Sequence, residues 1–166
     1  MRAARTMKRW RYSMAAFVCF LLVPTGETVK EECHCSPECK EIFEKPFYKR
    51  LDTGEVAARY PWNWGPGAMW NSKHTVGDCP CWDNCDGNHL TVVTPSGGYW
   101  DTNSRASNCT MKADRQHRCW VLHGMAPKLT VDKEGLTCRA GAGSIQSGKW
   151  HGFLTNGILS PTRQRQ

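Results

Sequence analysis

Short runs in which apolar and polar residues alternate, separated by glycine- and proline-containing turns, make up the chain from residue 89 onward. Many of the apolar positions are β-branched or aromatic, which is typical of β-strands. After residue 50, apolar residues almost never recur at the spacing of a helix. We therefore predict strands at 89–94, 98–101, 119–123, 129–132, 136–138 and 157–159, and a hairpin over 143–153.

This pattern predicts a small single domain that is α+β or mainly β, with short antiparallel strands and cysteine-rich loops. A short helix is expected over 40–48, in the polar and mixed N-terminal part of the domain.

The first 26 residues differ from the rest, because a basic start is followed by an apolar run at 14–23. That run is too short to span a bilayer as a helix, which needs about 20 apolar residues. A basic start and a short apolar run have the outline of a signal peptide. A start codon assigned too far upstream and a buried helix are the competing interpretations. The expected organisation is an N-terminal segment over 1–26 and one cysteine-rich domain over 27–166.

Charge does not point to nucleic acid. The formal net charge is +7, but five of the positive residues lie before residue 12. No stripe of Lys and Arg interleaved with aromatic residues follows them, so nucleic acid is not a favoured partner.

Two cysteine clusters share the spacing C-x-C-x3-C: Cys33, Cys35 and Cys39, and Cys79, Cys81 and Cys85. Thiolates are preferred zinc ligands, and a structural zinc site takes four Cys or His side chains. We predict structural zinc at these clusters, with His34, His74 or His89 as a fourth ligand. Disulfides and free thiols are the alternatives, and nine cysteines outside the N-terminal segment would leave one unpaired.

A further set of metal-binding side chains lies on the strand around 119–123. Alternate residues of a strand point to one face, so His117, Cys119 and His123 would share it. These three could bind a metal ion, or they could be ordinary strand residues.

The hairpin over 143–153 carries a serine and a histidine on opposite arms. With a two-residue loop at Ser147 and Gly148, Ser144 would lie directly opposite His151. Opposed side chains share one face of the sheet, with Cβ atoms about 4.5–5.5 Å apart. The imidazole could then take the hydroxyl proton, which activates a serine as a nucleophile. A one-residue slip of the register would separate the two side chains.

A third group is needed to orient the imidazole. Asp132 and Glu134 are the nearest acidic residues in the sequence and Asp114 lies further away; we assign the role to Asp132. Nearby glycines would let backbone N–H groups approach an oxyanion. The polar run at 101–108 could line a substrate groove.

Several segments together resemble a group of uncharacterised proteins encoded by phages and prophages: 101–110, 117–121, 123–124, 130–133, 141–145 and 151–154. The core Ser144-Ile145 and His151-Gly152-Phe153 also resembles the wider domain family of the serine peptidase in a bacterial ubiquitin-like (Bub) conjugation pathway. That resemblance implies that Ser144 is the nucleophile and His151 the base, and that the substrate is the precursor of a ubiquitin-like protein. This chain has Gly143 where the family usually has proline.

The sequence thus predicts a serine hydrolase, a peptidase acting on a ubiquitin-like or other protein or peptide substrate. One alternative is a non-catalytic, zinc-stabilised phage accessory protein whose aromatic loop at 60–72 is the contact surface. Another is a disulfide-rich exported protein. No stable membrane span is expected. The location would be intracellular, in a phage-infected or lysogenic bacterium, if the start is assigned too far upstream, and outside the cell if residues 1–26 are a signal peptide.

Overall fold

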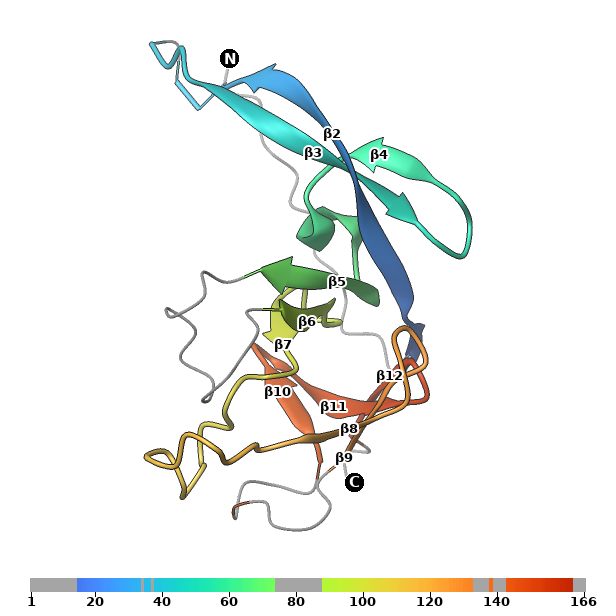
Figure 1. The fold of residues 1–166 in the computed structure, drawn as a ribbon, viewed down its shortest axis with the longest axis vertical. Helices are drawn as coiled ribbons and strands as arrows, with labels where there is room; N and C mark the ends of the chain where they lie inside the picture. The colour runs from blue at the N-terminus through green and yellow to red at the C-terminus, as the bar shows by residue number, and fades with distance from the viewer. Residues whose placement is uncertain are drawn as a thin grey trace.

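The computed structural model describes residues 15–33, 35–36, 38–73, 88–132, 138 and 143–162. Two β-sheets packed against each other form its framework (Figure 1). The elements are β1 (Phe17–Val18), β2 (Phe20–Glu32), β3 (Ile42–Arg50), β4 (Val56–Ala58), a 3-10 helix η1 (Pro61–Trp64), β5 (Ala68–Lys73), β6 (Asn88–Val93), β7 (Tyr99–Asp101), β8 (Val121–His123), β9 (Thr130–Asp132), β10 (Ile145–Ser147), β11 (Trp150–Thr155) and β12 (Ile158–Pro161).

The strand order is β4-β3-β2-β5-β6-β7 in the larger sheet and β1-β12-β11-β10 in the smaller one, while β8 and β9 form a separate pair. All pairs are antiparallel except β2 with β5. The prediction of a small, mainly β domain with short antiparallel strands is therefore confirmed. The strands expected around 89–94, 98–101, 119–123, 129–132 and 157–159 correspond to β6, β7, β8, β9 and β12.

The main core lies between the two sheets. The larger sheet contributes Met69, Val92 and Trp100, and the smaller sheet contributes Leu154 and Leu159, among others. Along β11, every second residue is buried, as expected for a strand with one face on the core. This alternation points the residues between them, His151 included, away from the core.

The apolar N-terminal run is part of this core and joins the two sheets. Phe17 pairs with Leu159 in the smaller sheet. Three residues later, Phe20 pairs with Ala68 in the larger sheet. Cys19 between them is 5% exposed. Strand β2 spans Phe20–Glu32 and so runs across residue 26, the expected boundary between 1–26 and 27–166.

The helix expected over 40–48 is wrong, because this segment forms most of β3. Strands β2 and β3 make a long hairpin that extends away from the packed sheets (Figure 1). Pro46 lies in the middle of the segment, and a proline inside a helix removes a hydrogen bond and clashes with the preceding turn. In β3, the aromatic residues Phe47 and Tyr48 pair with β4 instead.

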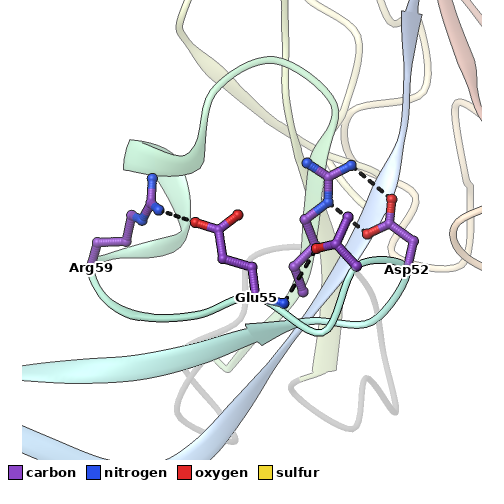
Figure 2. A network of polar contacts seen from close by, with 5 residues as sticks. Asp52, Glu55 and Arg59 are labelled. Carbon is purple, nitrogen blue, oxygen red and sulfur yellow. Dashed lines mark hydrogen bonds and ion pairs between the residues drawn. The ribbon is translucent and has the colours of Figure 1, made fainter.

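The turn between β3 and β4 is held by charged side chains (Figure 2). The Arg50 guanidinium donates two hydrogen bonds to Asp52, from Nε to Oδ1 at 2.6 Å and from Nη2 to Oδ2 at 2.7 Å. Arg50 lowers the pKa of the Asp52 carboxyl mainly through these bonds. Arg59 forms an ion pair with Glu55 at the other side of the turn. These contacts stabilise the hairpin and lie apart from the site described next.

Candidate functional site

The hairpin of β10 and β11 has a different register from the one predicted. Ser147 pairs with Trp150, so Gly148 and Lys149 form the two-residue turn, and Gln146 lies directly opposite His151. The turn has a positive φ of 57° at Gly148, as a type II′ turn requires at its first central position. The register therefore differs from the predicted one by two residues.

A shift of two residues keeps each side chain on its original face of the sheet. Ser144 consequently lies diagonally across from His151 instead of directly opposite. The distance between Ser144 Oγ and His151 Nε2 is 3.0 Å, which is a hydrogen bond. Ser144 is half-buried and His151 is exposed. The predicted contact between the two side chains is thus present, through a different pairing of the strands.

The Nε2 atom is the ring nitrogen that faces the nucleophile in Ser-His catalytic sites, where Nδ1 is held by a third group. Among the described residues, no hydrogen bond joins Asp132 to His151. Asp132 instead packs against the backbone just before the serine. A Cβ atom at Gly143 would lie 3.2 Å from both the Cα and the Oδ1 atoms of Asp132. Glu134 lies outside the described residues. Asp114 accepts hydrogen bonds from the backbone of Gln116 and His117.

Gly143 has a backbone conformation that a proline could not adopt. Its φ is +74°, whereas the proline ring holds φ near −65°. Glycine has no Cβ atom, so it reaches this region without strain and leaves room for Asp132. A proline at this position would therefore require a different backbone path into Ser144.

Ser144 and His151 open into a groove with a volume of about 700 Å³. Its lining comes from three parts of the chain: Trp100; Ser104, Arg105, Ala106, Ser107, Asn108 and Trp120; and Ser144, Gln146, Gly148 and His151. The rings of Trp100 and Trp120 meet edge to face, with centroids 5.2 Å apart. Residues 104–108 of the polar run at 101–108 line this groove. The position of Trp120 in this lining was not predicted, because no local pattern links it to residues 104–108.

Arg105 shapes one wall of the groove. Its guanidinium donates hydrogen bonds to two backbone carbonyl oxygens of the next loop, to Met111 at 2.9 Å and to Asp114 at 2.6 Å. Arginine offers several fixed donors, so one side chain can close a loop in this way. Residues 105–114 are thereby tied into a single turn-rich unit beside the groove.

Four buried side chains that can bind a metal ion meet behind that wall: Cys109, His117, Cys119 and Cys138. Their ligand atoms all lie within 4.8 Å of one another. Burial raises the pKa of the Cys119 thiol to about 11. Of the three strand residues predicted to share a metal-binding face, His117 and Cys119 belong to this cluster, whereas His123 is exposed on β8. Cys109 and Cys138 were missed, because neither belongs to a recognisable spacing.

The cysteine clusters predicted from the sequence have mixed outcomes. Cys33, Cys35 and Cys39 lie together at the end of the β2–β3 hairpin, within 4.8 Å of one another. Cys79, Cys81 and Cys85 lie outside the described residues, as do His34 and His74. His89 is buried, and its Nδ1 atom lies 2.7 Å from Asp101 Oδ2. None of the cysteines that the structure describes forms a disulfide.

The aromatic loop at 60–72 contributes a separate surface. Tyr60 and Trp62 stack with ring centroids 4.8 Å apart, and Trp62 also contacts Tyr99. Tyr99 precedes Trp100 on β7, and successive strand residues point to opposite faces. The aromatic surface therefore lies on the other face of the larger sheet from the groove.

Within the part of the chain that the structure describes, no helix has the length and apolar character needed to cross a membrane. Comparison of the chain with protein-family models, with curated proteins and with solved structures finds no match.

Proposed function

We propose that this protein is a serine hydrolase of the peptidase type, with Ser144 as the nucleophile and His151 as the general base. The observation that carries the proposal is the 3.0 Å hydrogen bond between Ser144 Oγ and His151 Nε2 at the edge of the groove. A serine hydroxyl is a weak nucleophile unless a base lies within hydrogen-bonding distance.

The reaction would proceed in two steps. His151 Nε2 takes the hydroxyl proton while Ser144 Oγ forms a bond to the substrate carbonyl carbon. The C–N bond of the substrate then breaks, and the amine leaves with the proton from His151. In the second step, His151 takes a proton from water, the resulting hydroxide attacks the acyl carbon, and the proton returns to Ser144 as the ester breaks.

The groove supports a peptide or protein as the substrate. Serine and asparagine side chains along one wall offer donors and acceptors for a peptide backbone. The indole rings of Trp100 and Trp120 offer an apolar surface for side chains. The resemblance to the peptidase of the ubiquitin-like conjugation pathway supports the same class, and it narrows the proposed substrate to the precursor of a ubiquitin-like protein.

Labelling with a fluorophosphonate tests this proposal. Such a reagent phosphonylates activated serines, so the purified protein should gain one covalent adduct, which peptide mass spectrometry should place on Ser144. Ser144→Ala and His151→Ala should each lower the labelling rate at least about 100-fold, because general-base catalysis contributes about 10²- to 10⁴-fold.

Two variants serve as matched controls. Ser147 lies on the same hairpin but does not line the groove, and His123 is an exposed histidine on β8. Ser147→Ala and His123→Ala should label like the wild type. An adduct on a different serine, or equal labelling of Ser144→Ala, would overturn the proposal.

The buried Cys/His cluster supports a second candidate, a non-catalytic accessory protein stabilised by zinc, with the Tyr60–Trp62–Tyr99 surface as its contact surface. A folded, metal-containing protein that takes no fluorophosphonate label would favour this second candidate over the hydrolase.

A further inference from the structure

The four side chains behind the groove wall have the composition of a closed structural metal site. Cys109, His117, Cys119 and Cys138 are between 3% and 6% exposed. A structural zinc site consists of four Cys or His ligands with no open position, and three cysteines with one histidine is a common set. Three thiols cannot all pair with one another as disulfides, and none of these three forms one in the structure.

The distances between the ligand atoms fit a tetrahedral zinc ion. With Zn–S near 2.3 Å and Zn–N near 2.0–2.1 Å, two sulfurs of a tetrahedron lie about 3.8 Å apart, and a sulfur and a nitrogen about 3.6 Å apart. In this protein Cys119 Sγ lies 3.9 Å from Cys138 Sγ and 3.6 Å from His117 Nε2. These two separations match those expected around the ion, and all four ligand atoms lie within 4.8 Å of one another.

Backbone N–H groups point at two of the sulfurs. The Ala106 N–H donates to Cys119 Sγ at 3.3 Å, and the Met111 N–H donates to Cys109 Sγ at 3.4 Å. Hydrogen bonds from the backbone stabilise the negative charge of a thiolate, and such partners orient the ligands of metal sites. Asp114 Oδ1 accepts the N–H of His117 and so shapes the turn that presents the imidazole.

The cluster is physically continuous with the groove. Ala106, which donates to Cys119, also lines the groove. Trp120 follows Cys119 in the chain and packs against both the main core and the cysteine cluster. Residues 102–120 contain no strand or helix that would hold them in place.

We propose that Cys109, His117, Cys119 and Cys138 bind one zinc ion, and that this ion fixes residues 104–120 as a wall of the groove facing Ser144 and His151. The zinc site does not depend on the proposed hydrolase activity. The proposal differs from zinc at the C-x-C-x3-C clusters in its ligands, its burial and its position beside the groove.

Zinc content measures the site directly. The full-length protein is expressed with zinc and its zinc content is measured. The Cys138→Ser variant should contain one equivalent of zinc per chain less than the wild type, and so should the His117→Ala variant. Cys19→Ala is the matched control. Cys19 is buried in the main core, where burial raises its thiol pKa to about 12, and it is not among the cluster residues. Its replacement should leave the zinc content unchanged. Equal zinc content in the wild type and the two cluster variants would overturn the proposal.

A second measurement uses the wild type alone, so it does not depend on the folding of a variant. The native protein is treated with a maleimide, with and without a zinc chelator, and modification is read for each cysteine by mass spectrometry. Cys109, Cys119 and Cys138 should react only with the chelator present, while Cys19 stays protected in both samples. The same pattern of modification in both samples would contradict the proposal that these cysteines bind zinc.

Trypsin tests the role of the ion in the groove wall. Arg115 and Arg118 are exposed in the segment that the ion would hold. Cleavage follows the population of locally opened chains. Chelation should therefore speed cleavage after these two residues at least about tenfold, with little change after Arg59 on the β3–β4 hairpin. Unchanged cleavage after Arg115 and Arg118 would contradict the proposal that the ion holds residues 104–120 in place. Because none of these readouts uses catalysis, failure of the zinc site and failure of the hydrolase can be told apart.

Discussion

Replacement of Gly152 by alanine is expected to destabilise the domain by about 3 kcal/mol or more, the largest stability loss that we expect from adding a single methyl group. A Cβ atom at this position would lie 2.2 Å from the backbone oxygen of Ser160 and 2.3 Å from the Trp150 ring. The neighbouring strand β12 supplies the first contact and the buried indole supplies the second. Neither can move without separating strands or opening the core.

Urea unfolding followed by tryptophan fluorescence measures this loss of stability. Gly54→Ala is the control, because Gly54 has a φ of +75° but a Cβ atom there would meet nothing within 4 Å. That substitution should cost about 1 kcal/mol from backbone strain alone. If Gly152→Ala unfolded at the same urea concentration as the wild type, the close packing of β11, β12 and Trp150 described here would be incorrect.

The loss of turnover on removing either member of the Ser144–His151 pair is the largest effect on activity that we expect. With an activated ester or a peptide substrate, Ser144→Ala and His151→Ala should each lower kcat/KM at least about 10³-fold. The double variant should be no slower than the slower single variant, because groups that act as a unit in catalysis have strongly non-additive effects.

The loss of kcat/KM in the double variant distinguishes a catalytic pair from two residues that contribute to the rate independently. If each residue merely helped to shape the groove, the two losses would multiply in the double variant. The residual rate of His151→Ala should also rise about tenfold per pH unit in alkaline solution, since hydroxide then replaces the imidazole as the base. A multiplicative loss in the double variant would contradict the proposed mechanism. Ser147→Ala and His123→Ala again provide the controls.

Local patterns predicted much of the fold correctly. Alternating apolar residues and turn glycines were sufficient to place β6, β7, β9 and β12, because a two-residue periodicity exposes one face of a strand and buries the other. The helix predicted over 40–48 does not form. Pairing with β2 and β4 decided the conformation of this segment instead, and a sequence pattern does not contain that long-range contact.

The Ser144–His151 contact was predicted correctly although the turn of the hairpin was placed wrongly. Any even shift of the hairpin register keeps both side chains on the same face, so the face was correct although the pairing was not. The face pattern does not choose between the two turns, each containing Gly148, because both registers place Trp150 and Leu154 on the core face.

The sequence by itself determined the β-rich character of the chain and the side of the hairpin that carries its serine and histidine, because both depend on residues close together in the chain. Only the tertiary structure brought Cys138 to Cys119, 19 residues away, and Trp120 to Trp100. Contacts of this kind are set by the way two sheets and a loop pack together, and no local spacing encodes them. The groove and the four-ligand cluster behind it are therefore products of folding.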